Sequence, residues 1–148
     1  PAGPSTIALS GTITPSVSGA TKDITITFTD TTTSAVYSVA ATKANNYAFS
    51  LDLPAAAATY TVSIGRGGYL ARTISGYQVA GTGDISGFNY ALYAGDVNGD
   101  KFISLPDITA IIARYNGDAA GRNEDVNDDG FITLPDITTV IANYNRAY

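Results

Sequence analysis

The 148-residue sequence contains no cysteine, histidine, methionine or tryptophan. Without cysteine or histidine it cannot form a disulfide, a thiolate or imidazole zinc site, or a catalytic triad that uses either residue. Its only glutamate is Glu124, and residues 1–94 offer four aspartates for the carboxylate pair that a glycosidase needs across a cleft. We therefore expect a protein that is not an enzyme.

Long hydrophobic runs are also missing. No stretch of about 18 consecutive apolar residues occurs, so we expect no insertion into a membrane. The first residues, PAGPST, lack the basic and then apolar segments of a signal peptide, and the chain does not begin with methionine. We expect it to be a piece excised from a longer protein.

Basic residues are scarce relative to acidic ones in the last third of the chain. Residues 1–94 carry four acidic and four basic side chains, whereas residues 95–148 carry nine acidic and four basic ones, which accounts for the whole net charge of -5. This difference favours two domains. Concentrated carboxylates repel nucleic acid and anionic membranes but attract divalent cations, so we expect a metal-binding region and no nucleic-acid partner.

The first 94 residues contain short alternating runs rich in Thr, Val, Ile, Tyr and Phe, separated by Gly, Pro, Asn and Asp. Ile24, Ile26 and Phe28, for example, fall on one face of a strand, with threonines on the other. The runs are IALSGTI, DITITFTD, AVYSVAAT, YAFSLDL, TYTVSIG, TISGYQV and DISGFNYALY. About seven strands of this kind predict a small antiparallel β-sandwich.

The rest of the chain is a duplicated block. Residues 95–116 read GDVNGDKFISLPDITAIIARYN, residues 124–145 read EDVNDDGFITLPDITTVIANYN, and 15 of the 22 paired positions are identical. After each acidic loop the apolar residues fall at helical spacing, which predicts two short helices that pack on each other. The residues predicted to face inward are Ile108, Ile111, Ile112 and Tyr115 in the first copy, and Ile137, Val140, Ile141 and Tyr144 in the second.

Each acidic loop has the ligand spacing of an EF-hand, with oxygen-bearing side chains at positions 1, 3, 5, 9 and 12 and a backbone carbonyl at position 7. The predicted ligands are Asp96, Asn98, Asp100, the carbonyl of Phe102, Ser104 and Asp107, and then Asp125, Asn127, Asp129, the carbonyl of Phe131, Thr133 and Asp136. Three carboxylates in each loop favour calcium over magnesium, which retains its waters, so we predict two calcium ions. The alternative is a pair of solvated acidic turns.

The loops depart from the EF-hand consensus in two ways. Position 6, which needs a positive backbone φ, is Gly130 in the second loop but Lys101 in the first, where it costs about 1 kcal/mol. Position 12 is aspartate in both copies, one methylene shorter than the usual glutamate. We expect both loops to fill, the first more weakly.

No helix is predicted before either loop, so each copy is a half-hand of loop and helix. Two such F-hand repeats, the GDVNGD opening and aspartate at position 12 resemble a dockerin module over residues 95–146. The resemblance implies calcium-dependent binding to a cohesin domain of a scaffoldin or cell-surface anchoring protein. It also implies a secreted protein of the cellulosome, which degrades cellulose and other plant polysaccharides outside the cell.

The β-rich part resembles the X module that precedes certain dockerins, especially those of type II. The stretch YAFSLDLPA followed by TYTVSIGRGGYL, running into GDVNGD, carries this resemblance. It implies an Ig-like sandwich over residues 1–94 that braces an α-helical dockerin over residues 95–148, with repeats at 95–116 and 124–145 and a linker at 117–123. We expect the pair to be monomeric before it binds a cohesin.

The helix faces opposite the predicted core would contact the partner. They comprise Leu105, Pro106, Thr109, Ala110, Ala113 and Arg114 in the first copy, and Leu134, Pro135, Thr138, Thr139, Ala142 and Asn143 in the second. Exposed leucine and proline beside small residues suit a flat partner surface. Because the two strips nearly match, we hypothesise two alternative binding orientations. The alternative is that Leu105 and Leu134 close the core.

Two further functions stay open from the sequence. Seven of the ten tyrosines lie in residues 1–94 and could make the sandwich a carbohydrate-binding module with a calcium-stabilised tail, although they are spread over separate strands. The chain could also be the dockerin end of a cellulosomal glycoside hydrolase.

Overall fold

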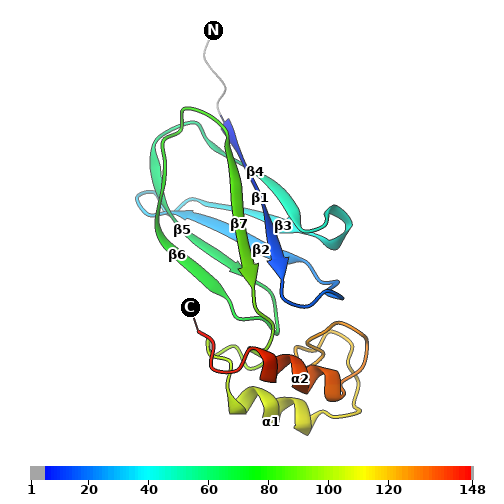
Figure 1. The fold of residues 1–148 in the computed structure, drawn as a ribbon. Helices are drawn as coiled ribbons and strands as arrows, with labels where there is room; N and C mark the ends of the chain where they lie inside the picture. The colour runs from blue at the N-terminus through cyan, green and yellow to red at the C-terminus, as the bar shows by residue number, and fades with distance from the viewer. Residues whose placement is uncertain (1–5, 148) are drawn as a thin grey trace. The chain divides into compact units, whose positions relative to one another are not determined.

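The computed structural model describes residues 6–147 and is mostly β-sheet with two short helices (Figure 1). The chain divides into two compact units. The sandwich unit comprises the described residues of Pro1–Thr14, Asp23–Ile64 and Thr73–Tyr90, and the repeat unit those of Pro15–Lys22, Gly65–Arg72 and Ala91–Tyr148. Segments 15–22 and 65–72 thus belong to the same unit as both repeats. Our boundary at residue 94 stays a prediction.

Seven strands form two sheets in the orders β4-β1-β7 and β3-β2-β5-β6. Their bounds are β1 Thr6–Pro15, β2 Ile24–Asp30, β3 Val36–Ala41, β4 Ala48–Pro54, β5 Ala58–Gly65, β6 Arg72–Val79 and β7 Ile85–Leu92. Each coincides with one of the seven predicted runs. Strands β1 and β4 pair antiparallel, as do β2 and β3. A short 3-10 helix, Lys43–Asn45, was not predicted.

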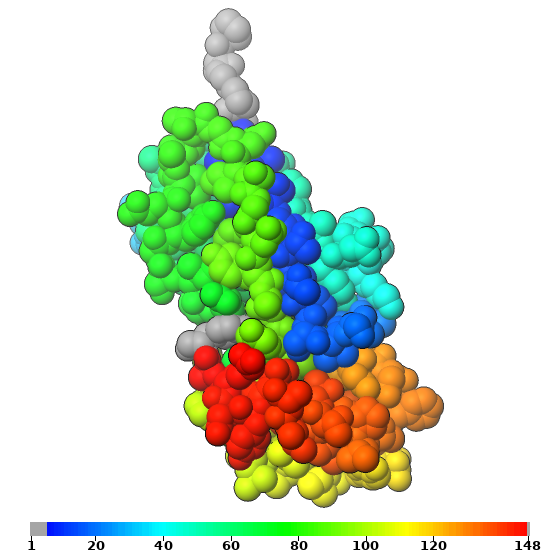
Figure 2. Space-filling model, viewed as in Figure 1, coloured from blue at the N-terminus to red at the C-terminus, as the bar shows by residue number. Residues whose placement is uncertain are grey.

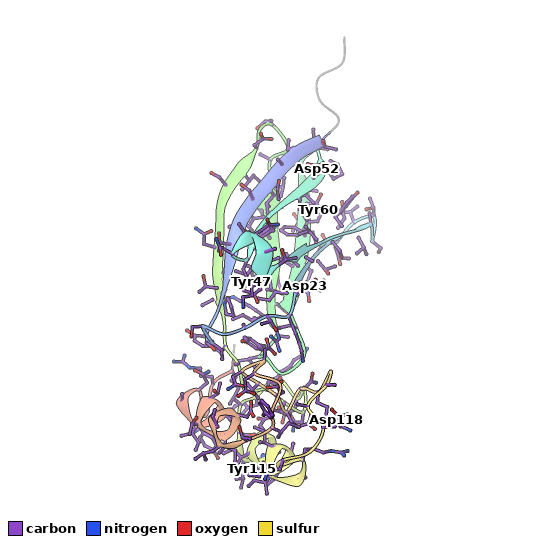
Figure 3. The ribbon with its side chains drawn as sticks, turned by 90° about the vertical axis from the view of Figure 1, so that its right-hand side faces the viewer. Asp23, Tyr47, Asp52, Tyr60, Tyr115 and Asp118 are labelled. Atoms are coloured by element: carbon purple, nitrogen blue, oxygen red, sulfur yellow. The ribbon has the colours of Figure 1, made fainter. Side chains whose placement is uncertain are left out.

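The alternating pattern in the sequence explains the core of the sandwich unit. Ile24, Ile26 and Phe28 of β2 are fully buried. The Phe28 ring lies 5.6 Å from Tyr60 of its own sheet and 5.5 Å from Phe88 of the other sheet, measured between ring centroids. Tyr60 is labelled among the strands of the sandwich unit in Figure 3. These aromatic contacts join the inner faces of the two sheets.

The helices of the repeat unit are α1, Leu105–Ala113, and α2, Leu134–Ala142. Each begins with the same local sequence: a hydroxyl residue at the N-cap, then Leu, Pro and Asp. Proline fits the first helical turn because it lacks an N–H that would have no partner there. The carboxylate of Asp107 accepts a hydrogen bond from the backbone N–H of Ser104 at 2.8 Å, and Asp136 does the same for Thr133 at 2.8 Å. No helix among the described residues is long and apolar enough to cross a membrane.

The predicted inward faces of the helices are only partly correct. Ile111 and Val140 are fully buried, whereas four residues predicted to be buried are 43% to 57% exposed, and these are Ile112, Tyr115, Ile141 and Tyr144. The two helices are nine residues long and contact each other along a narrow stripe. The loops supply the rest of the core, through Val97, Ile103, Val126 and Ile132.

Backbone hydrogen bonds tie each loop to the end of the opposite helix. The N–H of Asn145 donates to the carbonyl of Ile103 at 2.8 Å, and the N–H of Asn116 donates to the carbonyl of Ile132 at 2.9 Å. These two bonds join equivalent positions of the two copies. The repeats therefore interlock with internal two-fold pseudosymmetry, which brings both acidic loops into one compact unit.

Candidate functional site

Each acidic loop gathers three carboxylates around one point. Oxygens of Asp96, Asp100 and Asp107 all lie within 4.8 Å of one another, and so do those of Asp125, Asp129 and Asp136. Two oxygens that bind the same calcium ion at about 2.4 Å each can be at most about 4.8 Å apart. The spacing of the carboxylates and their hard oxygen chemistry therefore fit one such ion in each loop.

Backbone N–H groups hold the first and last carboxylates of each loop in place. In the first loop Asp96 accepts hydrogen bonds from the amides of Asp100 and Lys101 at 3.1 and 2.9 Å. Asp107 accepts from Val97 at 2.8 Å and from Ser104 at 2.8 Å, so it links the loop's start to the helix N-terminus. The equivalent bonds of the second loop have lengths within 0.1 Å of these.

The position-12 aspartates reach the cluster despite their short side chains. Asp107 and Asp136 are fully buried on the first turns of α1 and α2, and each belongs to its carboxylate cluster. The first turn of each helix thus lies close enough to its loop for the shorter aspartate side chain to reach the other two carboxylates.

Burial shapes the electrostatics of these carboxylates. It raises the pKa of Asp96, Asp125 and Asp136, and the charges of neighbouring aspartates raise each pKa further, while backbone hydrogen bonds lower it in part. Buried like charges are unfavourable unless they are compensated. A divalent cation would supply that compensation.

The other predicted ligands line the same loops. The side-chain oxygen of Asn98 accepts from the amide of Asp100 at 3.2 Å, and Asn127 accepts from Asp129 at 3.3 Å. Ser104 and Thr133 are half-buried at the N-caps of the helices. The rings of Phe102 and Phe131 are exposed, and only their carbonyls are predicted ligands. These ligand assignments stay predictions.

Each loop has two residues with a positive φ, at positions 4 and 6. The first loop has Gly99 at 74° and Lys101 at 67°, and the second has Asp128 at 59° and Gly130 at 84°. Glycine adopts this conformation freely, whereas other residues lose about 1 kcal/mol or more. Lys101 therefore has a counterpart in Asp128, and backbone strain does not by itself make the first loop the weaker one.

Asp128 makes a set of contacts that the sequence did not indicate. Its carboxylate forms two hydrogen bonds with the guanidinium of Arg66, at 2.6 and 2.9 Å, and both side chains are at most 2% exposed. It also accepts from the amides of Thr21 and Lys22, at 2.8 and 3.3 Å. Burial would raise the pKa of Asp128, but the hydrogen bonds and charge of Arg66 and the two amides together lower it.

The predicted docking strips are largely at the surface. The two repeats that carry them are the yellow and the orange to red regions of Figure 2. Leu105 and Leu134 are 58% and 57% exposed, so the alternative that they close the core is wrong. Ala110 and Thr139 are half-buried. Seven further residues of the strips are exposed, and they are Pro106, Thr109, Ala113, Arg114, Pro135, Thr138 and Ala142. The exception is Asn143, which is buried because its side-chain N–H donates to the carbonyl of Ala94 at 2.9 Å.

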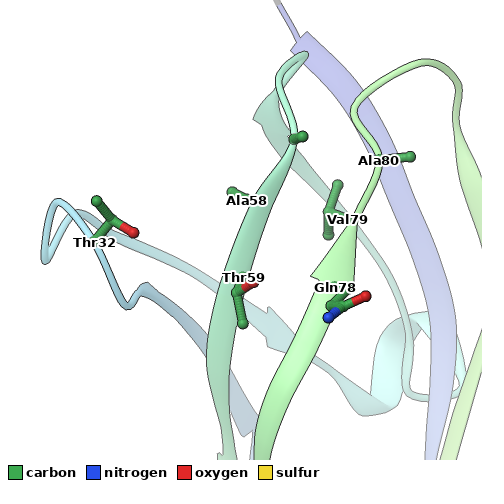
Figure 4. A pocket seen from close by; sticks show the side chains of 7 residues that line it. Thr32, Ala58, Thr59, Gln78, Val79 and Ala80 are labelled. Atoms are coloured by element: carbon green, nitrogen blue, oxygen red, sulfur yellow. The ribbon is translucent and has the colours of Figure 1, made fainter.

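The sandwich unit has a hollow of about 600 Å³ on its surface (Figure 4). The residues that line it are Thr32, Ala57, Ala58, Thr59, Gln78, Val79 and Ala80. None of these seven has an aromatic ring that could stack on a sugar or a charge that could bind one. The hollow therefore gives no support to the carbohydrate-binding alternative.

Comparisons with known proteins agree with the repeat geometry. Residues 94–145 match the family model described as the dockerin type I domain. No curated protein sequence matches the chain. Two solved structures from Acetivibrio cellulolyticus, an N-terminal and a C-terminal interface mutant of a type II cohesin–X–dockerin complex, are similar to it with TM-scores of 0.70 and 0.69.

In both cases the identity is 26%, and the match covers 95% of this chain and 97% of the other. Together, the family-model match over residues 94–145 and the structural matches support an X module–dockerin dyad.

Proposed function

We propose that the chain is a non-catalytic, calcium-dependent docking module that binds a cohesin domain and so incorporates its parent protein into a secreted cellulosome. The observation that supports this most directly is a duplicated apolar surface on two helices, each of which begins in a carboxylate cluster. The similar solved structures are cohesin complexes of the same module pair. The sandwich would brace the dockerin rather than perform chemistry.

Calcium would act as part of the fold. Two ions, one in each loop, would be held by the predicted oxygen ligands, with the position-12 aspartates joining each loop to its helix. Four of these carboxylates are at most 5% exposed, and they are Asp96, Asp107, Asp125 and Asp136. With so many buried carboxylates, we expect the repeats to depend on the metal for stability.

The docking surface proposed here includes residues that the sequence placed in the core. Ile112 and Tyr115 of the first copy are exposed, as Leu105 is, and we add them to the first docking strip. Ile141 and Tyr144 are exposed in the second copy and are added to the second strip. Paired residues have nearly equal exposure: 57% and 56% for the isoleucines, and 45% and 43% for the tyrosines. Tyr115, two residues after the end of α1, is labelled in Figure 3. Tyrosine is among the residue types that most often dominate interface energies.

This equality supports two alternative binding orientations related by the internal pseudosymmetry. In each orientation one strip would take the central place in the interface. Arg114 against the buried Asn143 is the main difference between the copies, and it would bias the choice.

Calorimetry against a panel of type I and type II cohesins tests the proposal, first in calcium and then in chelator. We expect tight binding in calcium to one class and none in chelator. The family match is to type I and the structural matches are to type II complexes, so the panel also decides the class. Calcium uptake without binding to any cohesin would contradict the docking function.

Strip variants test the two orientations. Leu105→Ala with Ile112→Ala alters the first strip, and Leu134→Ala with Ile141→Ala alters the second. If both orientations serve, either pair alone costs little, whereas all four changes cost more than about 2 kcal/mol of binding free energy. Val36→Ala is the matched control, because Val36 is an exposed apolar residue of the sandwich, at 60%. Full loss from one pair alone would show a single orientation.

A further inference from the structure

The two calcium loops differ in sequence at positions 4, 6 and 9, and the contacts of Asp128 described above involve position 4. Gly99 occupies this position in the first loop and has no side chain, whereas Asp128 in the second loop is buried against Arg66. We propose that Arg66 is a positioning residue that holds the second loop in its binding conformation, so that the second site binds calcium more tightly than the first and fills before it. This inference rests on the calcium sites of the proposed function.

Arg66 is itself held rigidly. Its Nε donates to the carbonyl of Gly67 at 3.0 Å, and its guanidinium carbon lies 4.2 Å from the centre of the Tyr69 ring. The planar guanidinium presents two parallel N–H donors to the two carboxylate oxygens of Asp128. The contact therefore fixes the direction of the Asp128 side chain as well as its position.

The backbone around Arg66 packs against the last residue of the linker, directly before the second repeat. A Cβ on Gly68 would lie 2.9 Å from the carbonyl oxygen of Asn123, and a Cβ on Gly67 would collide with the Asn123 side chain. The carbonyl of Gly68 also accepts from the N–H of Gly95 at 2.8 Å. Close packing of this kind leaves segment 65–72 little freedom to move away from the loop.

A second segment, residues 15–22, holds Asp128 from another direction. The amides of Thr21 and Lys22 both donate to Asp128 Oδ2, and the ammonium of Lys22 lies 3.9 Å from Oδ1. Lys22 Nζ also donates to the carbonyl of Arg122, at 3.4 Å, just before the loop. Position 4 of the second loop is thus fixed by donors that lie outside both repeats.

Fixing Asp128 fixes its neighbours in the loop. Asn127 and Asp129, at positions 3 and 5, are predicted ligands, and the φ of 59° at Asp128 sets the direction of the chain between them. A loop that is already ordered loses less conformational entropy when it binds a metal. By linkage, calcium in this loop strengthens the Arg66 contact to the same extent.

Removing Arg66 alone would mix two effects. The loop would lose the support of Arg66, which weakens calcium binding, but Asp128 would lose the buried positive charge paired with it, so its negative charge would attract the cation more strongly. The charge-neutral double variant Arg66→Met/Asp128→Asn isolates the first effect. Lys43→Met/Asp52→Asn is the control, because it also replaces one basic and one acidic side chain by neutral ones, at exposed positions of the sandwich unit.

The test is a calcium titration of the full chain by calorimetry and by two-dimensional NMR, in which the amides of Lys101 and Gly130 report the two loops separately. In the parent chain we expect Gly130 to respond first. In the double variant we expect the affinity of the second site to fall roughly tenfold, the equivalent of ordering one residue, while the first site keeps its affinity. The control should match the parent chain.

A second variant guards against loss of folding. Arg66→Met/Asp128→Gly also removes the support without changing the net charge, but it relieves the positive φ at position 4, so it should weaken the second site without strain. Equal affinities of the two sites in the parent chain, or an equal loss at both sites in the variants, would overturn the inference and leave calcium binding intact. No calcium uptake by the parent chain would overturn the proposed function as well.

Discussion

The sandwich unit and the repeat unit are stabilised by opposite kinds of interior. In the sandwich, Phe28, Tyr60 and Phe88 form a cluster of apolar rings that contact one another at centroid distances of 5.5 to 5.6 Å around Phe28. In the repeats, four buried carboxylates lie among a few aliphatic side chains, with oxygens in two tight clusters. An apolar core is stabilised by burial alone, whereas buried carboxylates need a compensating charge. The solution conditions should therefore act strongly on one unit and weakly on the other.

Chelation should produce the largest difference between the units. In excess chelator we expect the backbone amides of α1 and α2 to lose their protection from hydrogen exchange, because the repeats have too small an apolar core to offset chain entropy. The amides of β2 and β5 should stay protected. Hydrogen exchange followed by NMR, with and without calcium, measures both units in one sample. Equal protection of the helices with and without calcium would contradict the prediction that the repeat unit depends on the metal and the sandwich unit does not.

The sequence predicted the elements well because each has a local pattern. Alternation in runs such as Ile24–Thr29 marks a strand whatever it packs against, and a Leu-Pro-Asp sequence after a hydroxyl residue marks a helix start. The carboxylate clusters follow in the same way, since all members of one cluster lie within a dozen residues.

The errors concern packing between distant residues. Helical spacing placed Ile112 and Tyr115 in the core. How wide a face a helix buries depends on what packs against it, and here Ile111 is fully buried whereas Ile112 and Tyr115 are exposed. The Arg66–Asp128 contact joins residues 62 positions apart, and nothing local to either one indicates the other. Asn143 was misplaced for the same reason, because its partner Ala94 lies 49 positions away.

Truncating the aromatic core should have the next largest effect, on the sandwich. Phe28 is fully buried and contacts rings of both sheets, so Phe28→Ala should lower the free energy of unfolding by about 3–5 kcal/mol. Denaturant unfolding followed by tyrosine signals in the sandwich measures the loss. Calcium affinity, measured by calorimetry at low temperature where the variant stays folded, should not change. A parallel loss of calcium affinity would show that the two interiors are not independent.

A substitution that strains the backbone of a calcium loop should have a smaller effect, on the stability and calcium affinity of the repeat unit. Gly130 has a φ of 84°, and a Cβ there would meet nothing within 4 Å, so Gly130→Ala introduces backbone strain of about 1 kcal/mol and no clash. Gly121→Ala is a matched control, because Gly121 has a φ of 69° with equally open space but lies in the linker. Both changes should lower stability similarly, and only Gly130→Ala should weaken calcium binding. Equal calcium affinities in the two variants would show that position 6 does not shape the site.

The smallest predicted effect is a dependence of the sandwich unit's stability on pH, through Asp30. The amides of Thr33 and Thr32 donate to Asp30 in the turn after β2, and these bonds lower its pKa below 3.8, whereas burial raises the pKa of Asp96 in the first loop. An aspartate with a lowered folded-state pKa adds stability that is fully present above its unfolded pKa, and this stability is lost as the pH falls through the folded value. Asp30→Asn should therefore lower the melting temperature of the sandwich slightly at pH 7, and the difference should disappear in acid below the folded pKa. Melting curves of both proteins across this range, with a carboxyl NMR titration of Asp30, measure the effect. A difference that stays constant with pH would mean that the turn depends on hydrogen-bond geometry and not on the charge of Asp30.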